Sequence, residues 1–161
     1  MKTLKQIANK IDFEYEFTSN KEAISNKHRK DVPSILALDA LFVIKVNDEV
    51  YLRAEIAILE FYKSLFKWKE TITEDHIREF HYYTIEYDDY KNGAILSLLP
   101  CSDKQATIQS IWSESDTHHL FNLDYIVSKF CDLERNLRRD IEHYFNINLN
   151  SFIQHIPYYC L

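Results

Sequence analysis

The order of strand-like and helical patterns limits the fold of this chain most strongly. Apolar and acidic side chains alternate over residues 11–17, which is the period-two pattern of a half-buried strand. The same alternation covers 34–46 and 49–56, and Asn47-Asp48 between them is typical of a tight hairpin turn. The chain therefore begins with a strand followed by a hairpin.

Helical spacing then replaces the alternation over residues 56–69 and again over residues 122–145. Three more strand patterns separate these helices, near 80–87, 94–99 and 105–113. Strands with hairpin-length links and long helices between them indicate an α+β protein. We predict an antiparallel sheet of about six strands and two main helices, in the order β-β-β-α-β-β-β-α.

The first helix, 56–69, is apolar around most of its circumference. Its polar residues form one narrow stripe, made of Glu60, Lys63, Ser64 and Lys67. A helix this apolar packs on more than one side. We expect either that the sheet wraps it or that its second face meets a partner.

The second helix has clearer signals at its start and on its surface. Asn122 is a candidate N-cap, because its side chain can accept a hydrogen bond from the first turn. Glu134, Arg138 and Glu142 follow one another at four-residue spacing, which predicts an exposed ladder of ion pairs. The tail after residue 148 is expected to add a short helical turn.

Length and composition indicate one globular α+β domain over residues 1–161, because 46% of the residues are hydrophobic. The polar segment 18–34 is expected to be its least ordered, mobile part. Three irregularly spaced cysteines fit reduced thiols, and no secretory signal or membrane span is expected, which together favour the cytoplasm.

The stretch EYDDYKNG, residues 86–93, contains the only glycine of the chain, Gly93. A single glycine excludes a P-loop and a dinucleotide fingerprint, since both need several. Asn92-Gly93 alone would make a two-residue turn, but that register mixes polar and apolar residues on each face. A six-residue loop, 88–93, instead pairs apolar residues, Tyr87 with Ala94 and Tyr83 with Leu98. We therefore predict a hairpin tip whose carboxylates lie in solvent.

Two pairs of residues are candidates for chemistry. His118-His119 is the best metal candidate, although adjacent side chains on an extended backbone point in opposite directions. The competing interpretation is a polar loop. His81 and Cys101 on facing strands resemble a base and a nucleophile, but a cysteine after a strand-end proline is commonly a small buried residue. We expect a metal-free protein without a cofactor.

Charge is distributed unevenly along the chain, whose net charge is −6. Residues 70–90 hold seven carboxylates against one arginine, and such a concentration attracts basic partners and repels phosphate backbones. The competing interpretation is a solvated surface that keeps the protein soluble. Basic residues of the last helix are interleaved with acids, so nucleic-acid binding is not expected. Several aromatic residues are expected at the surface as interface anchors: Tyr82, Tyr87, Tyr90, Trp112, Tyr158 and Tyr159.

The strings FYKSLFKW, FHYYTIEYDDYKNGAILSLLP, IQSIW and LDYIVSKF resemble a set of small uncharacterised bacterial proteins, over roughly residues 35–156. Several small acidic α+β proteins of this general type act as immunity proteins, which bind and block a toxin. The resemblance includes no mechanistic motif, and it assigns no functional residue.

These observations favour a non-enzymatic protein-binding module, an immunity-type inhibitor that occludes a basic toxin such as a nuclease. The residues expected to bind the toxin are Glu74, Asp75, Glu79, Glu86, Asp88, Asp89 and Tyr90. One alternative is a small enzyme or ligand-binding domain that uses His81 and Cys101, or His118 and His119. Another is a cytosolic oligomer of housekeeping role that associates through helix 56–69.

Overall fold

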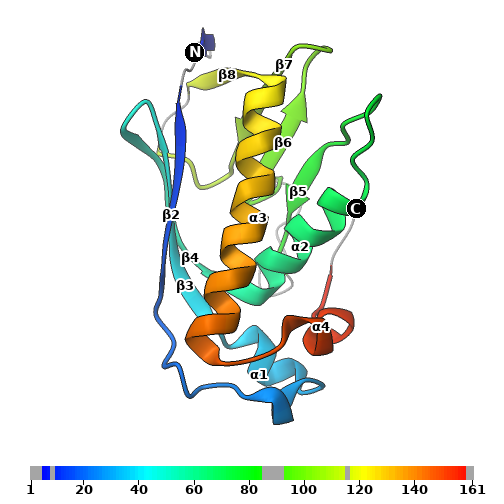
Figure 1. Ribbon diagram of the computed structural model, residues 1–161. Coiled ribbons are helices and arrows are strands. Elements are labelled where there is room, and N and C mark those ends of the chain that lie inside the picture. The colour runs from blue at the N-terminus through cyan, green and yellow to red at the C-terminus, as the bar shows by residue number, and fades with distance from the viewer. Residues whose placement is uncertain (1–4, 8–9, 85–92, 115–116, 159–161) are drawn as a thin grey trace.

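The protein is an α+β structure built on two sheets (Figure 1). The computed structural model describes residues 5–7, 10–84, 93–114 and 117–158. The first sheet is antiparallel, with the strand order β2-β3-β4. These strands span Ile11–Phe17, Asp39–Val46 and Glu49–Ala57.

The second sheet has five strands in the order β1-β8-β7-β6-β5. It is antiparallel except where β1 pairs with β8 in parallel. In this spatial order the strands are Lys5–Ile7, His118–Asn122, Gln105–Gln109, Leu96–Pro100 and Phe80–Tyr82. The predicted class is confirmed, but the prediction of one sheet was wrong. The chain leaves the first sheet when β4 runs directly into a helix at Ile58.

Two long helices, α2 (Ile58–Glu70) and α3 (Leu123–Phe145), pack against each other and join the sheets. The short helices α1 (Val32–Leu36) and α4 (Leu149–Phe152) lie near the C-terminal end of α3 (Figure 1). Single 3-10 turns, η1 (Asn26–His28) and η3 (Ile153–His155), complete the described elements. No helix in the described ranges has both the length and the apolar character needed to cross a bilayer.

The first hairpin turns where it was predicted. Asn47 and Asp48 both have positive φ, 50° and 69°, as a tight turn between twisted strands requires. The strand before it begins later than predicted, at Asp39, because residues 32–36 form α1. Asp31 caps this helix and Pro33 lies in its first turn, where a fixed φ favours helix. The segment 18–34 therefore includes regular structure, and Ile24 is buried in the core.

The second hairpin exists, but its predicted register was wrong by three residues. Phe80 pairs with Leu98, and Tyr82 pairs with Leu96. Both aromatic side chains are about 1% exposed, so burial of these larger rings decided the register. Gly93 has the expected positive φ, 105°. The remaining residues of the predicted tip, 88–92, lie outside the described part of the chain.

Three of the four residues in the polar stripe of α2 are buried, namely Glu60, Lys63 and Ser64. Lys63 donates a hydrogen bond from its amine to the Ile156 carbonyl at 2.8 Å, and Glu60 accepts one from the Tyr82 hydroxyl at 3.2 Å. Burial, followed by the nearby Lys67 charge, lowers the pKa of Lys63. The second face of α2 therefore meets the C-terminal segment and β5 of its own chain, which leaves less of this helix exposed for an oligomer interface.

The predicted start of α3 is confirmed, since the Asn122 side chain accepts from the Tyr125 amide at 3.0 Å. The expected exposed ladder was wrong at Glu134, which is 6% exposed. Its carboxylate accepts hydrogen bonds from the Tyr62 hydroxyl at 2.6 Å and from the Lys69 amine at 2.8 Å. Burial, and then the bond to Glu134, raise the pKa of Tyr62. The Glu134 carboxylate needs these hydrogen bonds because it is buried where α3 packs against α2.

Phe130 lies where both sheets and α2 meet. Its ring makes edge contacts with Phe13 of β2 at 5.2 Å, Phe80 of β5 at 5.7 Å and Trp68 of α2 at 5.9 Å between centroids. Edge-to-face pairs of this kind each add about 0.5–1.5 kcal/mol beyond the burial of their area. One fully buried side chain thus contacts three separate elements.

We predict that Phe130→Ala lowers the free energy of unfolding by about 3–5 kcal/mol, because it opens a cavity at this junction. Ser128→Ala, an exposed position on the same helix, serves as the control and should change it by less than about 0.5 kcal/mol. Urea unfolding followed by circular dichroism measures both. A loss of under about 1 kcal/mol for Phe130→Ala would contradict the central role of this ring.

Candidate functional site

A groove of about 960 Å³ runs between three segments of the chain. One wall is the loop 74–79 between α2 and β5, and the other consists of the β6–β7 turn and the first turn of α3. We call it the acidic groove, after its five carboxylates: Glu74, Asp75, Glu79, Asp103 and Asp124. Among the described residues that line the groove, Arg78 is the only other one with a full charge. The groove therefore carries a negative charge at neutral pH.

The first wall is held by the end of α2. The Trp68 indole N–H donates to the Arg78 carbonyl at 2.8 Å, which ties the far end of the loop to the helix. Thr73 and His76 form an isolated antiparallel bridge, with the Thr73 amide donating to the His76 carbonyl at 3.1 Å. Glu74 and Asp75 lie at the tip of this bridge, where a tight turn keeps both side chains exposed.

The second wall depends on a small polar turn. The Ser102 hydroxyl accepts hydrogen bonds from the amides of Lys104 and Gln105, both at 3.2 Å, and this turn presents Asp103. The Leu123 amide donates to the Lys104 carbonyl at 2.8 Å, which joins the turn to the start of α3. Asp124 lies in the first turn of α3, where the helix dipole favours a carboxylate.

Sequence analysis identified part of this site. Glu74, Asp75 and Glu79 were predicted partner-binding residues, and the fold brings them to one groove. The other predicted residues, Glu86, Asp88, Asp89 and Tyr90, lie outside the described part of the chain. Asp103 and Asp124 were missed because they are distant in sequence. A signal for Asp124 was present, since an N-cap at Asn122 places it in the first helical turn.

His81 and Cys101 both line the acidic groove, but hydrogen bonds do not join them. The two ring nitrogens of His81 contact the Ser97 hydroxyl at 2.6 Å and the Glu79 carboxylate at 3.0 Å. The Cys101 thiol instead donates to the Leu99 carbonyl at 3.5 Å. The predicted base and nucleophile are therefore neighbours without the contact that would activate the thiol.

The row Ser97, His81, Glu79 has the residue types of a hydrolytic triad. Its exposure is the reverse of what nucleophilic catalysis requires, because Ser97 is only 4% exposed while the Glu79 side chain is 60% exposed. Ser97 also lies within the regular strand β6, paired with Gln109, where no substrate carbonyl can approach it. The row is better explained as a way to fix the His81 ring at the rim of the groove.

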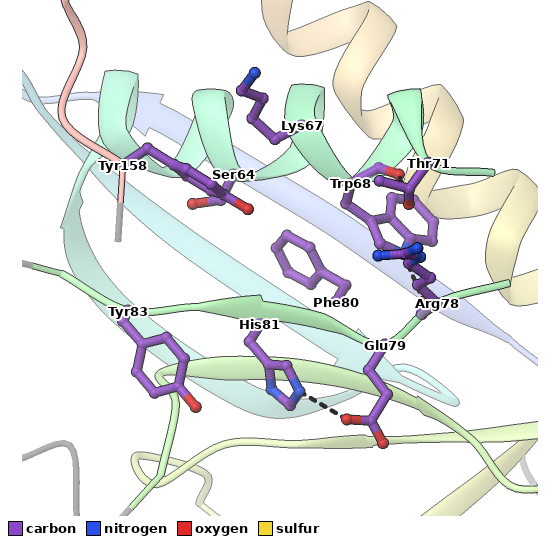
Figure 2. A pocket seen from close by; sticks show the side chains of 10 residues that line it. All are labelled: Ser64, Lys67, Trp68, Thr71, Arg78, Glu79, Phe80, His81, Tyr83 and Tyr158. Carbon is purple, nitrogen blue, oxygen red and sulfur yellow. Dashed lines mark hydrogen bonds and ion pairs between the residues drawn. The ribbon is translucent and has the colours of Figure 1, made fainter. Parts of the chain in front are cut away.

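A smaller cavity of about 160 Å³ adjoins the groove, and the two share Arg78, Glu79 and His81. It lies between α2 and β5 (Figure 2). Phe80 points toward α2, whereas His81 points to the opposite side of β5 (Figure 2). The lining of the cavity combines aromatic residues, among them Trp68, Phe80 and Tyr158, with the charged Lys67, Arg78 and Glu79.

The aromatic residues that were expected at the surface differ in their exposure. Tyr158 is exposed, at 41%, and lines the smaller cavity. Trp112 is half-buried against the core. Tyr82 was wrongly predicted to be exposed, since it is 1% exposed, and its phenol reaches the buried Glu60. The others, Tyr87, Tyr90 and Tyr159, lie outside the described residues.

His118 and His119 lie in β8, not in a polar loop as the competing interpretation held. The Tyr51 ring meets the His119 ring edge-on, with centroids 5.7 Å apart. Across the described ranges, no three His, Cys, Asp or Glu side chains gather in a way that would hold a metal ion. The His119 Nδ1 atom is buried and has no hydrogen-bond partner there. Burial lowers the pKa of His119, the Glu49 carboxylate opposes this shift, and the His118 ring adds to it.

We predict that His119 makes the protein less stable in mild acid. Its folded-state pKa lies below the unfolded value of about 6.5, so the unfolded chain binds the proton first as pH falls. The free energy of unfolding should therefore decrease as pH drops through about 6.5 toward the folded-state pKa. His119→Phe retains a ring against Tyr51 and removes this loss.

Urea unfolding at several pH values from 7.5 to 5 tests this prediction. The variant should become more stable relative to the natural protein as the pH falls, and His143→Gln controls for loss of a histidine from an exposed helical position. Parallel stability curves for His119→Phe and the natural protein would rule out the effect.

Comparison with known proteins gives a family assignment. No curated protein and no solved structure is significantly similar to the chain. Residues 13–143 match the family described as Domain of unknown function (DUF7878). This range runs from β2 to the last turn of α3, so it includes both walls of the acidic groove. Because it covers well over half of the sequence, the chain belongs to the DUF7878 family.

Proposed function

We propose that this protein is a non-enzymatic protein-binding module, most concretely a bacterial immunity-type inhibitor of a basic toxin such as a nuclease. The observation that supports this proposal is the acidic groove. Segments that are far apart in sequence place five carboxylates around one hollow of about 960 Å³, with a single arginine among them. Such a surface complements a domain rich in lysine and arginine.

Inhibition would follow from occlusion. A nuclease holds the phosphates of its substrate with basic side chains, and the carboxylates of the groove would take the place of those phosphates. The exposed Tyr158 lies close enough to contribute an aromatic anchor, because its cavity shares three residues with the groove. An inhibitor with this role would act in the cytoplasm, where such a nuclease finds its substrate.

Electrostatic attraction between such surfaces acts mainly on the rate of association. The interaction should weaken as salt rises to physiological ionic strength, where the Debye length is about 8 Å. The groove carboxylates are exposed, and surface charges of this kind contribute little to folding. Their removal should therefore separate binding from stability.

We expect a gene for a toxin with a basic nuclease domain directly beside the gene for this chain, and that domain is the probe of the test. We predict that Glu74→Lys combined with Asp103→Lys, which reverses one charge on each wall, slows association by about tenfold or more. Stopped-flow association rates and cleavage of a plasmid by the nuclease measure binding and inhibition. The proposal fails if the natural protein leaves nuclease activity unchanged.

A matched control is Glu22→Lys combined with Glu55→Lys. Both positions are exposed acids that do not line the groove, and the net charge changes by the same amount. This control should associate nearly as fast as the natural protein, and all three proteins should melt at similar temperatures. Equal slowing by both double variants would mean that overall charge, and not the groove, controls the association.

A further inference from the structure

The strand β2 forms an edge of the three-stranded sheet. It runs for seven residues and pairs with β3 one-to-one from Ile11 to Phe17, without a bulge. Figure 1 shows it along the margin of the molecule, beside α3. The opposite edge, β4, is partly covered, because the Glu114 amide donates to the Tyr51 carbonyl at 2.9 Å. A long, regular edge is a ready site for pairing with another strand.

Hydrogen bonds at both ends of β2 define which backbone groups face outward. The Asn47 amide donates to Lys10 at 2.9 Å, and the Thr18 amide donates to Asp39 at 3.0 Å. In an antiparallel pair, every second residue of a strand bonds to the same neighbouring strand. Lys10 and Thr18 bond to the β3 side, so the even-numbered residues of β2 between them bond to β3 as well. The odd-numbered residues therefore direct their N–H and C=O groups away from β3.

One of these outward groups is already used. The Ile11 amide donates to the Tyr125 hydroxyl of α3 at 3.0 Å. For Phe13, Tyr15 and Phe17, no hydrogen bond from an outward backbone group to another described residue is formed. The edge is thus capped at its start and available over the following residues.

A groove of about 500 Å³ lies between this edge and α3. Its α3 wall is polar, and the acids on it are paired. Asp132 bonds to Arg135, and Asp140 bonds to Arg139 at 3.1 Å and to the Tyr15 hydroxyl at 2.5 Å. Lys129 also lines this wall, and its amine lies over an aromatic ring of α3 instead of beside a carboxylate. This wall therefore suits small uncharged side chains better than basic ones.

The other face of β2 is acidic, with Asp12, Glu14 and Glu16 at alternate positions. Lys45 of β3 pairs with Glu14 at 3.0 Å, but Glu16 lies opposite Leu41 and forms no ion pair with a described residue. A strand added at the open edge would place alternate side chains beside these carboxylates. Opposite charges across neighbouring strands are favourable, and like charges are not.

We propose that the β2 edge binds an extended segment of a partner protein by β-strand addition, and that lysine or arginine alternates with small uncharged residues in that segment. The main-chain groups of Phe13, Tyr15 and Phe17 supply the hydrogen bonds. Glu16 supplies most of the specificity, because Asp12 and Glu14 already pair with Lys10 and Lys45. A second copy of this chain fits poorly, because antiparallel β2 strands would set carboxylates against carboxylates. This surface shares no residue with the acidic groove and does not depend on its function.

The test uses a capped seven-residue peptide in which lysine and threonine alternate, and a matched peptide in which glutamate replaces lysine. Amide hydrogen exchange is measured by NMR on the full chain. The lysine peptide should slow exchange at Phe13, Tyr15 and Phe17, whereas the amides already bonded to β3 should change little. The glutamate peptide should have no effect at the same concentration.

Glu16→Lys should weaken binding of the lysine peptide by about tenfold and strengthen binding of the glutamate peptide. Glu55→Lys is the matched control. Glu16 pairs with Leu41 of β3, and Leu41 pairs with Glu55 of β4, so Glu55 lies in the same cross-strand row but two strands away from the β2 edge. It should leave both affinities nearly unchanged. Glu16 is exposed, so the variant should fold, and its melting curve verifies this.

Three results would overturn the proposal. The first is protection by the lysine peptide only at residues of the acidic groove. The second is equal protection of the β2 amides by both peptides. The third is protection of these amides that rises with protein concentration in the absence of peptide, since this would identify a second copy of the chain as the occupant.

Discussion

The contact of Phe130 with three separate elements is the interaction on which the rest of the architecture depends. The sheets have no strand in common, and the chain crosses between them twice, from β1 to β2 and from β4 through α2 to β5. The Phe130 ring meets Phe13 of one sheet, Phe80 of the other and Trp68 of α2. Because no strand pairing joins the two sheets, side-chain packing at this junction has to fix their relative orientation.

The same junction also positions the candidate site. Trp68 packs on Phe130 through its ring, while its indole N–H holds the Arg78 carbonyl at the end of the loop 74–79. Phe80, two residues further on, is buried against the same ring. One wall of the acidic groove is therefore fixed from within the core, although its carboxylates are exposed. The aromatic contacts of Trp68 and Phe80 thus position the loop 74–79, which carries the charged side chains.

The sequence predicted those turns, caps and helices whose formation depends on residues close together in the chain. The Asn47-Asp48 turn, the Asn122 cap and the spans of the two long helices could be predicted because each depends on residues close in sequence. The register of Phe80 and Tyr82 could not, since it depends on which rings the distant helices accommodate. For the same reason Glu134 was expected in an exposed ladder, although the Tyr62 hydroxyl, from elsewhere in the chain, satisfies it in the interior. The candidate site was predicted only where its residues are close in sequence, as Glu74, Asp75 and Glu79 are.

The parallel pairing of β1 with β8 has a consequence for synthesis on the ribosome. Lys5 lies opposite His118, so β1 has to wait until β8, far later in the chain, has been made. The meander β2-β3-β4 is complete by Ala57, and even its most distant pair, Ile11 with Val46, is closer in sequence than Lys5 and His118. Pairs of lower sequence separation form sooner. Domains begin to fold while synthesis continues, so this meander can form first and the five-stranded sheet last. Strand β1 would thus be among the last to join its sheet, although it precedes the other described strands in the chain.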